Sequence, residues 1–204
     1  MASAASASRP RLVLATLNRA KARELIALLG EIPYTIVPLV DVPGATLPEE
    51  TAETYEGNAL LKAQAAVRFD GAVAVADDSG LEVDALSGGP GVRSARFGGP
   101  GLDDAGRVAL LLDRLRGVPL ERRTARFRCV IAVLDRTGPA RTVEGVVDGL
   151  IVDAPRGTGG FGYDPVFLYP PLGRTFGELS DAVKADVSHR GRAARKARAL
   201  LGRW

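Results

Sequence analysis

The stretch Ala76-Asp77-Asp78-Ser79-Gly80 lies between an apolar run at residues 71–76 and an alternating run at residues 81–84. The first run is typical of a buried strand and the second of a half-exposed strand. Adjacent carboxylates between two strands repel each other and are costly to bury unless a positive group meets them. A divalent cation such as magnesium is the simplest partner, since it prefers hard oxygen ligands. The alternative is an Asp-Asp-Ser-Gly turn.

Composition indicates an ordinary globular protein. The chain has 204 residues, of which 46% are hydrophobic, and a net charge of +3. This predicts one domain at residues 10–204, after a disordered Ala/Ser tail at residues 1–9, and it implies no non-specific nucleic-acid binding. The lone Cys129 excludes a disulfide framework and fits a reducing cytoplasm. No apolar run is long enough to span a bilayer, and the tail lacks the features of a signal peptide.

The first polar cluster follows an apolar strand expected at residues 11–15. Thr16 to Lys21 then open a helix that is expected to end at Leu29, before Gly30. Backbone amides and the helix dipole at such an N-terminus favour an anion. Lys21 opposes that dipole, which indicates a bound negative group. An ordinary N-cap is the alternative.

A second cluster belongs to the helix expected at residues 54–69, after a likely strand at residues 34–37. Asn58 and Lys62 lie one turn apart on one face of this helix. Glu49 and Glu50 precede it and add a carboxylate to the proposed metal site. The alternatives are an exposed polar stripe for Asn58 and Lys62 and a solvated acidic loop for the two glutamates.

The middle of the chain carries weaker signals. The Gly-rich segment 87–99 contains Arg93 and Arg96, which would suit a phosphate, but structural turns explain its glycines better. Residues 102–115 predict an amphipathic helix without chemistry. Residues 126–134 and 142–151 predict an antiparallel pair of strands joined by a turn at 137–139.

Two further clusters complete the pattern. In residues 157–167, glycines surround Phe161, Tyr163 and Asp164. Such a loop would let an aromatic ring stack on a base while the acid reads a polar edge of that base. A buried aromatic turn is the alternative. Lys184 precedes Ser188-His189-Arg190-Gly191, a dense group of donors expected at a break between two helices, before a basic helix with a solvated face. Only four of the 27 basic residues are lysines, and three of them, Lys21, Lys62 and Lys184, fall in these clusters.

In this order, the motifs resemble those of the Ham1-like family of non-canonical purine nucleoside triphosphate pyrophosphatases. The resemblance extends from Arg11 to Leu201, and five motifs in one order are specific although each alone is weak. One departure is Gly57, where the family often has an acid. The resemblance implies an α/β fold with a long mixed β-sheet and flanking helices, in two lobes around a central cleft, assembled as a homodimer. The expectations of a cytoplasmic location and of no nucleic-acid or membrane partner rest on the composition described above.

The resemblance also implies hydrolysis of inosine, deoxyinosine and xanthosine triphosphates (ITP, dITP and XTP) to the monophosphate and pyrophosphate with magnesium (Mg2+), which cleanses the nucleotide pool. Asp78 is the implied proton acceptor, and Glu49, Asp77 and Asp78 are the implied metal ligands. The implied substrate-binding residues are Thr16, Leu17, Asn18, Arg19, Ala20, Lys21, Lys62, Ser79, Phe161, Gly162, Tyr163, Asp164, Lys184, His189 and Arg190.

Two other functions compete with this one. A Maf-like pyrophosphatase would prefer pyrimidine or modified nucleotides, and only the Phe161 loop and Ser188-His189-Arg190 argue against it. A non-enzymatic nucleotide- or RNA-binding module would use the basic C-terminal helix. Metal-dependent release of pyrophosphate from ITP separates such a module from an enzyme.

Overall fold

The computed structural model describes residues 9–70, 73–136 and 138–202. Seven strands form one mixed sheet in the order β2-β1-β3-β4-β5-β6-β7. The parallel pairs join β1 to β2 and to β3, and the remaining pairs are antiparallel. The strands are β1 (Arg11–Leu14), β2 (Thr35–Pro38), β3 (Val73–Val83), β4 (Thr124–Asp135), β5 (Arg141–Ile151), β6 (Phe167–Tyr169) and β7 (Arg174–Thr175).

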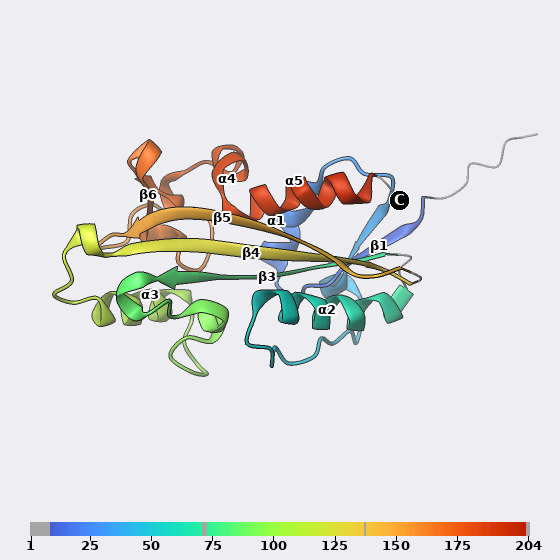
Figure 1. Ribbon diagram of the computed structural model, residues 1–204, viewed down its shortest axis with the longest axis horizontal. Coiled ribbons are helices and arrows are strands. Elements are labelled where there is room, and N and C mark those ends of the chain that lie inside the picture. Colours follow the sequence, from blue (N-terminus) through green and yellow to red (C-terminus); the bar gives the residue numbers. More distant parts are fainter. Residues whose placement is uncertain (1–8, 71–72, 137, 203–204) are drawn as a thin grey trace, which may run out of the picture.

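Helices cover both faces of this sheet, as expected for an α/β fold. Near β1, α2 packs on one face, while α1 and α5 pack on the other (Figure 1). At the opposite end, α3 and the segment around β6 enclose a third apolar cluster that contains Phe127, Phe167 and Phe176. The helices are α1 (Arg19–Leu29), α2 (Tyr55–Asp70), α3 (Asp104–Arg114), α4 (Asp181–Val187) and α5 (His189–Leu201).

Most of the predicted elements are confirmed within one or two residues, among them the strands at residues 11–15 and 34–37 and the helix at 54–69. The short strands β6 and β7 were not predicted. Residues 1–8 of the expected tail, residues 71–72 of the expected strand and Thr137 of the expected turn lie outside the described residues. In the described part of the chain, no helix has the length and apolar character needed to cross a membrane.

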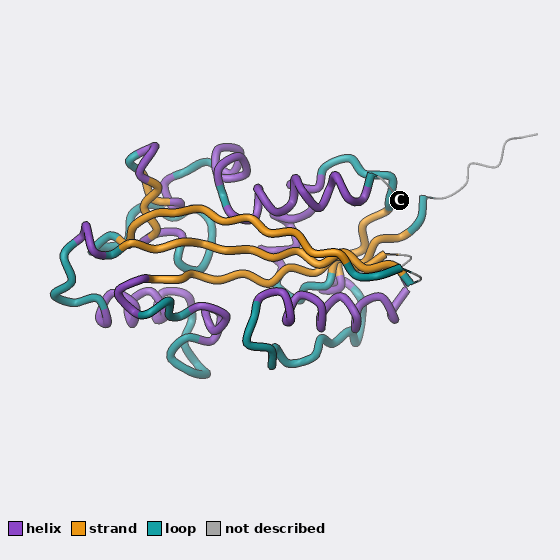
Figure 2. The backbone as a smooth tube through the Cα atoms, in the orientation of Figure 1, coloured by secondary structure: helices purple, strands orange, loops and turns teal. Residues whose placement is uncertain are grey.

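The acidic stretch differs from its prediction. Residues 77–80 were expected to separate two strands, but β3 runs through them without a break (Figure 2). β4 pairs with β3 along its whole length, from Val73 opposite Asp135 to Val83 opposite Ala125. This ladder satisfies the backbone, so long-range pairing overrides the turn preference of Asp, Ser and Gly.

The continuous strand separates the two aspartates. Successive side chains of a strand point to opposite faces of the sheet, so Asp77 faces α1 and α5 while Asp78 faces α2. β1 pairs with β3 only as far as Val75, and both acids therefore lie just beyond the carboxyl end of a parallel strand. Open α/β sheets place their ligands at such an edge.

Candidate functional site

Asp77 lies among cationic side chains. Its carboxylate is 3.5 Å from Lys21 Nζ and 3.3 Å from Arg190 Nη2, and Ser79 Oγ lies 3.4 Å away. Burial alone would raise its pKa, but Lys21 and Arg190 outweigh that effect and hold the pKa of Asp77 well below its ordinary value. Asp77 Oδ1 is buried and has no hydrogen-bond partner among the described residues, which leaves one strong acceptor available.

Asp78 lies in a different environment on the other face. It accepts from Lys62 Nζ at 3.0 Å and from Asn58 Nδ2 at 3.3 Å. Burial raises its pKa; Lys62 opposes this, Glu50 reinforces it, and the net pKa of Asp78 lies above its ordinary value. The neighbouring aspartates therefore have pKa values moved in opposite directions, a pattern typical of paired groups that act differently in acid–base chemistry.

In the acidic loop, Glu50 is the residue that contacts Lys62 and Arg96. Lys62 Nζ lies 2.7 Å from Glu50 Oε1. Arg96 donates to Glu50 Oε2 at 3.1 Å and to its backbone carbonyl at 3.0 Å. Burial would raise the pKa of Glu50, but Lys62, Lys21 and Arg96 together outweigh burial, and the pKa of Glu50 lies below its ordinary value. Glu49, the predicted ligand, has an exposed side chain, and sequence reasoning had no means to distinguish two adjacent glutamates in a loop.

The charge argument for a metal also needs correction. The positive groups that meet the aspartates are Lys21, Lys62 and Arg190, and no group of three or more His, Cys, Asp or Glu within the described ranges is arranged to hold a metal. The oxygen donors nevertheless suit a hard divalent cation. Lys62 Nζ marks a point where the carboxylates of Glu50 and Asp78 converge on one positive charge.

The start of α1 supplies the third polar group. Asn18 caps the helix, because its Oδ1 accepts from Ala20 N at 2.9 Å and Lys21 N at 3.1 Å. Thr16 Oγ1 accepts from Asn18 N at 3.2 Å. These caps satisfy the first amides, and Lys21 remains as the group that an anion would meet. Two predicted residues of this turn lie elsewhere: Leu17 is exposed, and Arg19 forms an ion pair with Asp41.

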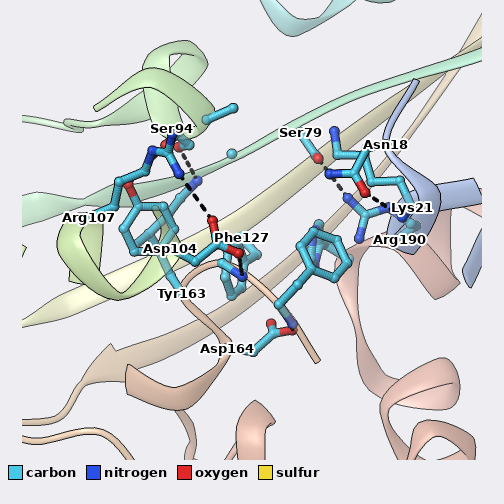
Figure 3. Close-up of a pocket in the computed structure, with 16 residues that line it drawn as sticks. Asn18, Lys21, Ser79, Ser94, Asp104, Arg107, Phe127, Tyr163, Asp164 and Arg190 are labelled. Carbon is cyan, nitrogen blue, oxygen red and sulfur yellow. Dashed lines mark hydrogen bonds and ion pairs between the residues drawn. The ribbon is translucent and has the colours of Figure 1, made fainter. Parts of the chain in front are cut away.

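A cavity of about 290 Å³ extends from the start of α1 to the aromatic side chains of Phe127, Phe161 and Tyr163. Figure 3 shows Asn18, Lys21, Ser79 and Arg190 at one end. At the other end lie Ser94, Asp104, Arg107 and Tyr163. The helix expected to carry no chemistry, α3, thus contributes two charged side chains to the wall.

Phe161 forms part of this wall under two cations. Lys184 Nζ lies 5.1 Å and Arg190 Cζ 5.4 Å from the centre of its ring. Asp164 holds this arrangement, because it accepts from Phe161 N at 2.9 Å and from Lys184 Nζ at 2.7 Å. Tyr163 is buried and donates to Ser94 O at 2.9 Å. Of the expected aromatic pair, Phe161 therefore lines the cavity beneath the cations, while Tyr163 anchors the loop.

Arg190 links β3 to α1 on the face of the sheet that carries Asp77. Its guanidinium donates to Asp77, to Ser79 Oγ at 2.7 Å and to Glu24 Oε2 at 2.8 Å. Glu24 also lies 3.3 Å from Lys184 Nζ. Sequence reasoning missed Glu24, and its only signal was its place one helical turn after Lys21. Most donors of Arg190 are therefore engaged with carboxylates before any ligand arrives.

His189 forms the floor of the cavity. Its ring stacks on Phe127 with centroids 4.6 Å apart and an angle of 12° between the planes. Its Nδ1 is buried without a hydrogen-bond partner in the described part of the chain. Burial, with the nearby charges of Arg190 and Lys184, holds the pKa of His189 well below its ordinary value, so the ring is neutral at pH 7.

This neutral histidine predicts a pH-dependent stability. Below about pH 6.5, His189 binds a proton in the unfolded chain but stays neutral in the folded protein. The free energy of unfolding therefore falls as the pH drops. His189 is the only histidine, and a His189→Phe variant should lack this dependence between about pH 6.5 and 5. Urea titrations at several pH values measure it. A wild-type protein with the same pH dependence as the variant would contradict the prediction.

The sequence matches the model of one protein family and individual relatives. The model of the Ham1 family matches residues 12–200. The dITP/XTP pyrophosphatase of Desulforamulus reducens is 50% identical over 193 residues, which cover 95% of this chain and 96% of that protein. The dITP/XTP pyrophosphatase of Geobacter sulfurreducens is also 50% identical, with coverage of 90% and 92%.

Two solved structures have a fold similar to that of this chain. A HAM1 protein from Coxiella burnetii superposes with a TM-score of 0.86 at 36% identity, over 96% of this chain and all of that one. A nucleoside-triphosphatase / dITP/XTP pyrophosphatase from Mycobacterium abscessus superposes with a TM-score of 0.72 at 42% identity, over 92% and 97%.

Proposed function

The chain belongs to the Ham1 family, and from that premise we propose that it hydrolyses ITP, dITP and XTP to the monophosphate and pyrophosphate. The observation that carries the proposal is the single cavity with two chemically different ends. Lys21 lies at one end and contacts Asp77, whose neighbour Asp78 has a pKa moved in the opposite direction. Phe161 lines the wall beneath two cations. A purine nucleoside triphosphate has the same division between a polyanion and an aromatic base.

The triphosphate is proposed to bind at the end of the cavity that carries Lys21, near Lys62. Lys21 and Lys62 supply charge, and Thr16 and Asn18 hold the turn that positions Lys21. Asp78 accepts a proton from the water that attacks the α-phosphorus, and the bond from that phosphorus to the bridging oxygen breaks to release pyrophosphate. The raised pKa of Asp78 suits a proton acceptor.

Magnesium is the proposed cofactor. Glu50 and Asp78 would supply carboxylate oxygens for it, with Glu49 as a further predicted ligand. Asp77 Oδ1 has no hydrogen-bond partner among the described residues. When bound, the ion neutralises charge on the phosphate oxygens. The carboxylates are balanced by basic side chains in this structure, so a polyanion that draws Lys62 away would free them for the metal.

The base is proposed to stack on Phe161. Lys184 and Arg190 also lie over that ring, and Asp164 fixes both the loop and Lys184. His189 Nδ1 is a buried polar atom in need of a partner, and it is proposed to read the edge of the purine. Gly162 and Tyr163 position the loop through Asp104 and Ser94, and Ser79 supports Arg190.

The remaining assembly is also a proposal. Residues 10–204 would form one two-lobed domain, with the cleft between the lobes as the active site, acting as a homodimer in the cytoplasm. The end of the cavity at Lys21 and the end at Arg107 are built from different parts of the chain, α1 and α3, which supports the two-lobed description.

The function is tested with purified protein, ITP or XTP, and magnesium. Equal amounts of monophosphate and pyrophosphate are expected, without nucleoside diphosphate. Activity should fall when the divalent cation is chelated and return when magnesium is restored. Release of inorganic phosphate instead of pyrophosphate, or full turnover in the chelator, would contradict the proposal. A preference for pyrimidine nucleotides would favour the Maf-like alternative.

A further inference from the structure

Arg107, on the first turn of α3, has an unsatisfied donor in the cavity wall. Its Nη1 lies 3.2 Å from Asp104 Oδ1. Its Nε is buried without a hydrogen-bond partner among the described residues. A buried N–H that gives up water costs free energy unless an acceptor meets it, so a bound ligand is expected to bring one.

The position of Arg107 limits what that acceptor is. Figure 3 places Arg107 at the end of the cavity opposite Lys21 and Arg190. A nucleotide whose phosphates meet Lys21 extends away from it through the ribose to the six-membered ring of the base. The part of the ligand that reaches Arg107 is therefore the outer edge of the purine.

The chemistry of that edge separates the candidate substrates. Xanthine carries a carbonyl acceptor at C2, hypoxanthine carries only hydrogen there, and guanine carries an amino donor. Arginine can only donate. The Arg107 guanidinium can therefore donate a hydrogen bond to the xanthine carbonyl. Hypoxanthine offers it no partner at C2, and the guanine amino group places a second donor against it.

We propose that Arg107 is a specificity-determining residue that donates to the C2 carbonyl of xanthine and disfavours guanine. The inference rests on the proposed function. Asp104 keeps Arg107 in place and also accepts from Gly162 N at 2.8 Å, so it ties the guanidinium to the loop that carries Phe161. Arg190 is less suited to donate to the C2 carbonyl, because most of its N–H groups already donate to Asp77, Ser79 and Glu24.

The test compares Arg107→Met with the wild type on XTP, ITP and GTP. Loss of a hydrogen bond to a charged donor should lower kcat/KM for XTP by about 10- to 100-fold. The value for ITP should change by less than about 3-fold, since no partner is lost at C2. The ratio of GTP to ITP activity should rise. Arg114→Met, an exposed arginine on the same helix, is the matched control and should behave as wild type.

Binding of the monophosphates provides a second measurement that needs no turnover. Calorimetry should show a selective loss of XMP affinity in Arg107→Met, with IMP affinity retained. An equal loss for both nucleotides, or no loss for either, would overturn the role of Arg107 while the proposed hydrolysis still stands. A wild-type protein that neither hydrolyses nor binds these nucleotides would overturn both.

Discussion

An Asp78→Asn variant is expected to hydrolyse ITP at least ~10²-fold more slowly than the wild type, the usual scale for loss of a general base. Asparagine keeps the shape of the side chain and its contact with Asn58, but it cannot take up a proton at this position. The raised pKa of Asp78 makes this carboxylate, and not its neighbour Asp77, the basic member of the pair. Steady-state kinetics at saturating substrate measure the effect.

Folding should survive this substitution. Lys62 keeps its contact with Glu50 at 2.7 Å, so no buried cation is left unpaired. Glu53→Gln, which changes an exposed acid just before α2, is the matched control and should retain full activity. Turnover near the wild-type rate in a folded Asp78→Asn protein would remove Asp78 as the proton acceptor and direct attention to Asp77.

Local signals predicted the elements that depend on local chemistry. Asn18 and Gly30 bound α1 as their capping preferences require. The sparse use of lysine also proved informative, because Lys21, Lys62 and Lys184 all pair with acidic residues of the candidate site. A compact ammonium suits such buried positions.

The predictions were wrong where contacts between segments far apart in the sequence determine the structure. Asp77 to Gly80 have turn preferences, yet β4 holds them in a strand. Gly80 fits there because a Cβ atom would lie 2.7 Å from Ser94 Oγ and 2.8 Å from the Tyr55 hydroxyl. Glu24 and Arg107 look like surface positions of amphipathic helices, but in the fold Glu24 pairs with Lys184 and Arg190, and Arg107 lines the cavity. No local pattern contains that information.

The pairing of Arg190 with Asp77 leads to the other large effect. Their side chains are 2% and 1% exposed, and removal of one member of a buried pair leaves an uncompensated charge. Arg190→Met is therefore expected to lower the free energy of unfolding by about 3 kcal/mol, the low end for such pairs, because Lys21 still contacts Asp77. Urea denaturation measures it.

A second substitution separates charge from packing. In Asp77→Asn/Arg190→Met an uncharged amide replaces the buried carboxylate. The double variant should therefore be more stable than Arg190→Met alone, even though it carries one more change. The pKa of Asp77, held low by Lys21 and Arg190, should rise in the single variant, and stability should then be lost less steeply as the pH falls. If the double variant is less stable than Arg190→Met, packing and the contact with Glu24 account for the cost, and the buried ion pair does not.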